Sequence, residues 1–171
     1  MKKITILFLN VIFINLLFSN SFKLHLLFTN NIHGAIHEVP ARFINPEFSP
    51  ILAGGAGAFT YASKIRKEAK LKEDFVMLTD AGNIFQGSQL GTYDGGSNII
   101  KWMNWMAYDA IVPGVRDFDQ GVNNLSKLAS EANFPFLASN LEGVDGIEDY
   151  KIIDANGVKI GLIGLITPFI S

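Results

Sequence analysis

Three short segments of the chain gather amides, imidazole and carboxylates directly after apolar runs. The segments are T-N-N-I-H-G from Thr29, D-A-G-N-I-F-Q-G from Asp80 and G-V-R-D-F-D from Gly114. Each apolar run is typical of a buried strand, so the segments are expected as loops at one end of a sheet. In α/β proteins that edge usually carries the chemistry. Oxygen and imidazole groups of these kinds can hold divalent metal ions.

The elements that must position these loops are strands alternating with helices. A loop marked by Pro40, Pro46 and Pro50 is expected between the first strand and the first helix, and Asn156-Gly157 signals a two-residue hairpin turn. The alternation predicts an α/β fold with right-handed crossovers, and the hairpin makes the predicted sheet mixed, with flanking helices. Strands are expected at residues 23–28, 75–79, 110–112, 136–138, 150–154 and 158–166, and helices at 54–70, 97–107 and 122–132.

Residues 1–21 are expected to be a signal peptide, and residues 22–171 a single domain. Lys2 and Lys3 precede an apolar stretch over residues 4–18, and Ser19-Asn20-Ser21 follows it. A basic start, about 15 mostly apolar residues and small residues at the exit are typical of secretion. The stretch is short for a membrane span of about 20 residues. Export to the periplasm or the extracellular space is predicted, with an uncleaved membrane anchor as the alternative.

The net charge and the cysteine content of the sequence limit the covalent links and the binding partners that can be expected. The formal net charge is −2, and the sequence has no cysteine, so it offers neither a disulfide framework nor a lipoprotein attachment site. The densest basic group, within residues 64–70, is interleaved with apolar residues and is balanced by Glu68 and Glu73. That pattern is typical of a solvated helix face. A nucleic-acid partner is therefore not expected.

Three other side chains are interpreted structurally. Asp80 stands at a strand end, where a capping or turn role is expected. Trp102 and Trp105 lie three residues apart on the predicted helix 97–107. The expectation for these two is core packing or cover of the sheet, and the alternative is an exposed aromatic patch that marks a partner surface.

The three segments resemble the motifs of the secreted 5′-nucleotidase and UDP-sugar hydrolase family of calcineurin-like metallophosphoesterases. They are similar to the family patterns T-N-D-x-H-G, D-A-G-D-x-x-Q-G and G-N-H-E-F-D, in the same order. The resemblance runs from about Leu24 to Pro168 and implies the first half of a four-layer α/β sandwich. Connecting segments agree, namely Gly54-Gly55, Y-D-A-I at Tyr108, A-N-F-P-F-L-A-S-N-L from Ala132 and V-K-I-G-L-I-G-L-I-T-P from Val158.

The resemblance implies a pair of divalent ions about 3.5–4 Å apart that activate a water on a phosphate ester. At the metal positions Asn31 replaces the first aspartate, Asn83 replaces the bridging aspartate, Val115 replaces an asparagine, and His33 is retained. At an effective dielectric near 20, a contact between a carboxylate and a divalent ion is of the order of 8 kcal/mol. Losing two such contacts predicts that no dinuclear centre forms, so no cofactor is expected.

The catalytic positions implied by the resemblance are also changed. Arg116 stands where the family has its catalytic histidine, Asp117 stands at the glutamate, and Asp119 matches the aspartate that orients the histidine. An arginine stays charged and cannot act as an acid or base near neutral pH. An ion pair between Arg116 and Asp119 is the favoured interpretation, and an anion site on Arg116 is the alternative.

Three hypotheses about function follow. The first is a catalytically silent, exported homologue that acts as a binding module, or together with a separately encoded second half or another exported protein. The second is a phosphomonoester or nucleotide hydrolase that works through a reduced site. The third is a non-functional remnant of an interrupted gene. The sequence has three histidines, His25, His33 and His37, and lacks the family's later G-H-x-H ligands, so only the first half of a catalytic domain is expected, without a substrate-binding domain.

Overall fold

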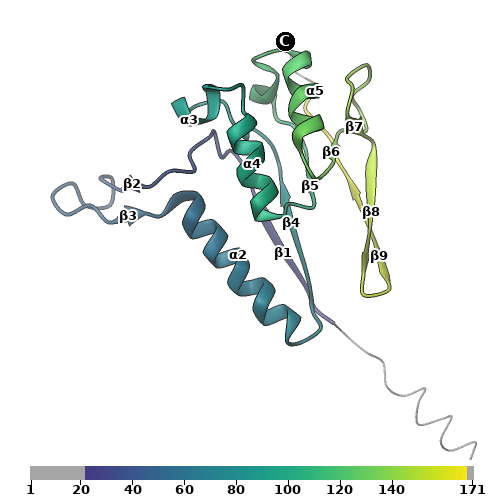
Figure 1. Ribbon diagram of the computed structural model, residues 1–171, viewed down its shortest axis with the longest axis horizontal. Coiled ribbons are helices and arrows are strands. Elements are labelled where there is room, and N and C mark those ends of the chain that lie inside the picture. Colours follow the sequence, from purple (N-terminus) through teal and green to yellow (C-terminus); the bar gives the residue numbers. More distant parts are fainter. Residues whose placement is uncertain (1–21, 169–171) are drawn as a thin grey trace, which may run out of the picture.

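The computed structural model describes residues 22–168 (Figure 1). The predicted signal peptide, residues 1–21, lies outside this range. Within the described part of the chain, no helix is both long enough and apolar enough to cross a membrane.

The centre of the molecule is a five-stranded parallel sheet in the order β1-β4-β5-β6-β7. Strands β1 and β4 pair along their whole length, with Leu24 opposite Phe75 and Thr29 opposite Asp80. This register brings the first two polar segments to the same edge, as the sequence predicted. The strands are β1 Leu24–Thr29, β4 Phe75–Asp80, β5 Ala110–Ile111, β6 Phe136–Leu137 and β7 Ile147–Glu148.

Helices α2, α4 and α5 lie on one face of this sheet (Figure 1). Helix α4 packs its Ile99, Ile100 and Met103, all fully buried, into the core that it shares with Leu125 and Leu128 of α5. The predicted helices are confirmed to within a residue or so at their ends. The helical segments are α2 Gly54–Lys70, α3 Gln89–Thr92, α4 Ser97–Met106, the 3₁₀ turn η1 Val115–Phe118 and α5 Val122–Glu131.

The closing hairpin is confirmed as β8 (Tyr150–Ala155) and β9 (Val158–Ile163). Its turn residues Asn156 and Gly157 have φ of 53° and 89°, the left-handed values that a two-residue hairpin turn requires. The hairpin forms a sheet of its own rather than extending the central one. The α/β class, with a parallel central sheet and flanking helices, is therefore confirmed, while the antiparallel pairing stands outside the central sheet.

The face of the central sheet opposite the helices is more exposed than the sequence predicted. Strand β1 was expected to be buried, yet Leu24, Leu26 and Phe28 are 43%, 52% and 73% exposed. Alternate residues of a strand point to opposite faces, and the helices cover only one of them. The second strand, β4, matches its prediction, with Met77 and Leu78 buried.

A short hairpin occupies the segment that was expected to be a long loop. Strands β2 (Val39–Pro40) and β3 (Ile51–Leu52) pair in antiparallel fashion. The residues between them fold around Asn45, whose Oδ1 accepts hydrogen bonds from the backbone N–H groups of Glu47 and Phe48, both at 3.0 Å. We call residues 39–52 the arm. It extends away from the sheet beyond the start of α2 (Figure 1).

Candidate functional site

The first and second polar segments run side by side at the carboxyl end of the sheet. Backbone hydrogen bonds join Asn31 N–H to the Gly82 carbonyl at 2.9 Å, and His33 N–H to the Asn83 carbonyl at 2.9 Å. The Gly34 N–H continues the series to the Ile84 carbonyl at 2.8 Å. The register of β1 and β4 thus continues beyond the strands. It holds the two sets of candidate ligands side by side.

Asn31, His33 and Asn83 adopt left-handed backbone conformations, with φ of 54°, 51° and 59°. Few residues other than glycine tolerate this region, and asparagine, aspartate and histidine are enriched there. An asparagine can therefore occupy the position of an aspartate without changing the path of the loop. The substitutions at residues 31 and 83 alter the chemistry of the site and leave the backbone geometry available.

Asp117 joins the third segment to the second, and sequence reasoning assigned it no such role. Its side chain is fully buried. One carboxylate oxygen accepts from the N–H groups of Asn83 and Gly114, and the other accepts from Ile84, each at 2.8 Å. Burial raises the pKa of Asp117, opposed by these backbone hydrogen bonds. An acidic residue three positions after the glycine that begins a helical turn is a capping signal that could have revealed this role.

The side chains of the two asparagines form a neutral hydrogen-bonded chain. Asn83 Nδ2 donates to Asn31 Oδ1 at 2.6 Å, and the backbone N–H of Arg116 donates to Asn83 Oδ1 at 3.0 Å. A backbone N–H can only donate, so it fixes the orientation of the Asn83 amide and leaves its NH₂ group facing Asn31. We call this arrangement the amide chain. It links all three polar segments without a formal charge.

His33 keeps the geometry of a potential ligand. Its Nδ1 lies 2.8 Å from the Gln86 carbonyl oxygen. A carbonyl only accepts, so Nδ1 donates in this contact and Nε2 takes no part in it. Metal-binding histidines are commonly oriented by such a hydrogen bond. Among the residues assigned to metal positions, His33 is the one that matches the family pattern.

Arg116 pairs with Asp119, as the favoured interpretation predicted. Its Nη1 lies 3.6 Å from Asp119 Oδ2, and the two side chains are 62% and 38% exposed. An exposed pair of this kind contributes about 1 kcal/mol or less to stability. Val115 is 40% exposed and brings no polar side-chain atom to the site. At these positions the third segment therefore supplies the ion pair of Arg116 with Asp119 and the apolar side chain of Val115.

This donor set does not fit two divalent cations. The amides of Asn31 and Asn83 are bonded to each other, and the Arg116 side chain adds a positive charge near them. Over residues 22–168, no group of three or more histidine, cysteine, aspartate or glutamate side chains is arranged to hold a metal ion. A neutral amide bridges two cations poorly, because it brings no negative charge to offset their mutual repulsion.

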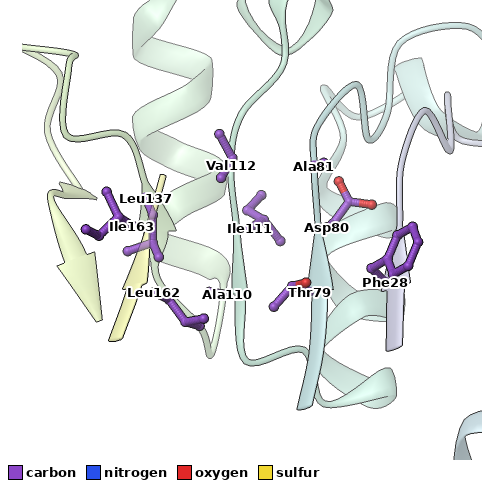
Figure 2. Close-up of a pocket in the computed structure, with 10 residues that line it drawn as sticks. All are labelled: Phe28, Thr79, Asp80, Ala81, Ala110, Ile111, Val112, Leu137, Leu162 and Ile163. Atoms are coloured by element: carbon purple, nitrogen blue, oxygen red, sulfur yellow. The ribbon is translucent and has the colours of Figure 1, made fainter. Parts of the chain in front are cut away.

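Asp80 has the turn role that was predicted for it, and it also joins a partly buried hydrogen-bond network. Its Oδ1 accepts from the Gly82 N–H at 2.6 Å, and its Oδ2 accepts from the Thr29 hydroxyl at 2.5 Å. Thr29 also lies 2.8 Å from the Tyr108 hydroxyl. Burial raises the pKa of Asp80 to about 6. Figure 2 shows its carboxylate between β4 and β1, beside Phe28, at the edge of a hollow of about 190 Å³ on the open sheet face.

The raised pKa gives Asp80 a defined effect on stability. The folded chain takes up this proton at a higher pH than the unfolded chain does, so protonation favours folding. As the pH falls from about 7 to about 5, the free energy of unfolding should rise by about 1 kcal/mol relative to an Asp80→Asn variant. Urea titrations of both proteins across this range measure the difference. A difference that stays constant, or that changes in the opposite direction, would contradict the assignment.

The chain is similar in sequence and in fold to known proteins. No protein-family model matches the chain. A snake venom 5′-nucleotidase from Crotalus adamanteus is 33% identical over 156 residues, which cover 86% of this chain and 26% of the venom protein. A 5′-nucleotidase precursor from Thermus thermophilus aligns with a TM-score of 0.72 and 25% identity, covering 86% of this chain and 29% of that one. A calcineurin-like phosphoesterase from Bacillus subtilis gives a TM-score of 0.60 at 26% identity, covering 85% and 48%.

The parallel sheet, its flanking helices and the loops at its carboxyl edge are the architecture that the chain shares with the calcineurin-like phosphoesterase and the 5′-nucleotidase precursor. Over most of its length the chain is similar to part of the 5′-nucleotidases, which confirms the resemblance found in the three motifs. The chain spans 26% of the Crotalus relative and 28% of the human 5′-nucleotidase. The match therefore concerns about a quarter of those proteins.

Proposed function

We propose that this chain is an exported 5′-nucleotidase homologue whose phosphoesterase site is catalytically silent, and that it acts as a binding or partner-dependent module. The amide chain is the observation that carries the proposal. A bridging ligand must direct an anionic oxygen at two cations. Here the oxygen of Asn83 is occupied by the Arg116 N–H, and its NH₂ group donates to Asn31. The bridging position thus holds an NH₂ donor and a neutral oxygen that already accepts one hydrogen bond.

The catalytic positions support the same proposal. Hydrolysis of a phosphate ester needs a group that stabilises or protonates the leaving oxygen. Arg116 keeps its proton near neutral pH, and its guanidinium faces Asp119. Asp119, which would orient a catalytic histidine, is engaged by the arginine that replaces it. General acid catalysis has no candidate at this position.

The retained geometry of His33 favours a second candidate function. With Nδ1 bound to the Gln86 carbonyl, Nε2 is free to coordinate a single cation. A hydrolase working through one metal would keep this histidine and recruit water for the remaining ligands. The third hypothesis, a non-functional remnant, predicts a chain that does not unfold cooperatively, in contrast to a folded module.

The domain layout, export and partners complete the proposal. Residues 1–21 act as a signal peptide and residues 22–171 as one domain, exported to the periplasm or the extracellular space. A relative from snake venom and another described as a precursor support export. The exposed apolar side chains Leu26, Phe28 and Ile163 on the open sheet face suit contact with a separately encoded second half or another exported protein. Nucleic acid is not proposed as a partner, and membrane attachment would require an uncleaved signal.

Hydrolysis assays test the silent site directly. The purified protein should show no turnover of AMP, a UDP-sugar or an aryl phosphate with Mn²⁺, Zn²⁺ or Mg²⁺. None of these ions should raise its melting temperature, because it has no competent site to which they bind. An Asn31→Ala variant is the matched control, because it removes part of the amide chain without adding a charge. It should likewise show no turnover and no stabilisation by these ions. Metal-dependent turnover that is lost in a His33→Ala variant would instead establish the single-metal hydrolase.

A further inference from the structure

The arm presents large apolar side chains to solvent. Phe43 and Phe48 are 81% and 84% exposed, and Ile44 and Ile51 are each 60% exposed. The turn between the strands is nevertheless ordered by Asn45, and Ala41 N–H donates to the Pro50 carbonyl at 2.8 Å to close its base. These aromatic rings therefore stand on a defined projection rather than on a flat surface. Exposed apolar groups gathered in this way are typical of an interaction surface.

A hollow of about 550 Å³ lies between α2 and α4. Gly55 lines the hollow and has no side chain to fill it. The Trp102 indole N–H donates a hydrogen bond to the Gly55 carbonyl at 3.3 Å. Its walls include Phe59 and Trp105, which are 46% and 77% exposed. Trp105 is thus neither core nor sheet cover, and the exposed aromatic patch is the interpretation that holds for it. Within the part of the chain that the structure describes, no charged residue lines the hollow. Such depletion of charge is typical of the centre of a protein interface.

The arm and the hollow adjoin each other on the molecule. Strand β3 ends at Leu52 and helix α2 begins at Gly54, so a single residue separates the base of the arm from the helix that lines the hollow. The arm points away from α2 (Figure 1), and none of its residues lines the hollow of its own chain. One continuous surface therefore carries both an apolar projection and an apolar depression.

We propose that this surface is a homodimer interface in which the Phe43 and Phe48 side chains of each copy occupy the hollow of the other. A two-fold axis pairs one surface patch with itself, so a patch that contains both projection and depression is self-complementary. Its exposed apolar side chains offer of the order of 800 Å² per copy, which is the area of an ordinary stable interface. They are Phe43, Ile44, Phe48, Ile51, Leu52, Phe59 and Trp105. A second copy is the occupant because it already carries the matching half of each contact.

Sedimentation velocity tests the proposal on the protein produced from the full-length sequence. The natural protein should shift from monomer to dimer between about 1 and about 100 µM. The substitutions Phe48→Ser on the arm and Trp105→Ser in the hollow should each weaken dimerisation at least tenfold, as truncation of a central aromatic does. Both side chains are exposed, so folding is preserved, which the melting temperature checks. Leu71→Ser is the matched control, because Leu71 is 81% exposed at the far end of α2.

Mixing the two variants separates the proposed geometry from general stickiness. Each variant alone has lost both contacts, since its arm or its hollow is damaged in both copies. A heterodimer of the two keeps one intact arm and one intact hollow that face each other. The mixture should therefore associate more strongly than either variant by itself. A natural chain that stays monomeric throughout, equal dimerisation by all variants, or a mixture no stronger than its components would each overturn the proposal.

Discussion

A variant carrying both Asn31→Asp and Asn83→Asp is expected to lose about 2–4 kcal/mol of unfolding free energy and to regain most of it when Mn²⁺ is added. In the natural chain, Asn83 Nδ2 donates to Asn31 Oδ1 at 2.6 Å. Carboxylates at both positions would remove this donor and place two negative charges in contact. A divalent cation would offset that repulsion, so stability should become dependent on metal. Urea unfolding with and without Mn²⁺ measures both effects.

The control for this variant is Asn45→Asp, the same chemical change in the arm. Asn45 Oδ1 only accepts hydrogen bonds from Glu47 and Phe48, so an aspartate there keeps both contacts and should cost little. Neither the control nor the natural protein should respond to Mn²⁺. If the natural protein were stabilised as strongly as the double variant, the amide chain would not exclude metal and the silent site would be refuted.

Replacing Asp117 with alanine is expected to lower the free energy of unfolding by about 3–5 kcal/mol. The carboxylate accepts three backbone hydrogen bonds, from Asn83, Ile84 and Gly114. Alanine would leave these N–H groups without an acceptor in a region shielded from water. The third polar segment would then separate from the second. Guanidinium unfolding, followed by tryptophan fluorescence and by circular dichroism, measures the loss.

Asp119→Ala is the matched comparison, two residues further along the chain. Its side chain is 38% exposed and pairs with Arg116 at 3.6 Å, so its removal should cost about 1 kcal/mol or less. Equal losses for the two variants would show that burial and backbone contacts do not distinguish them, and would contradict the role assigned to Asp117.

Much of the fold could be predicted because its helices are long enough to show a period. The helix predicted over residues 54–70 is observed as α2, with Ala62 and Ala69 buried and Phe59 46% exposed. The placement of the loops followed from strand order, since parallel strands end at a common edge. Contact between Asn31 and Asn83 could be expected on this basis, although their hydrogen bond could not.

Other features left too little signal in the sequence. The arm's strands are two residues each and include Pro40, so neither alternation nor composition marks them. The exposure of Leu26 and Phe28 depends on which face the helices cover, and an apolar run does not reveal that. The buried position of Asp117 depends on two distant loops approaching each other. Tertiary packing, rather than the local sequence, determines where such short strands pair and which loops come into contact.

The left-handed backbone at residues 31 and 83 also determines how easily the two asparagines could be replaced by aspartates. The same conformation accepts aspartate as readily as asparagine, and a single nucleotide converts one codon into the other. Restoring the carboxylates would therefore need neither an insertion nor a rearranged loop. At these two positions the amide and the carboxylate differ in charge and in the NH₂ donor, and not in the backbone that carries them, so the scaffold lies only a short mutational distance from carboxylates at residues 31 and 83.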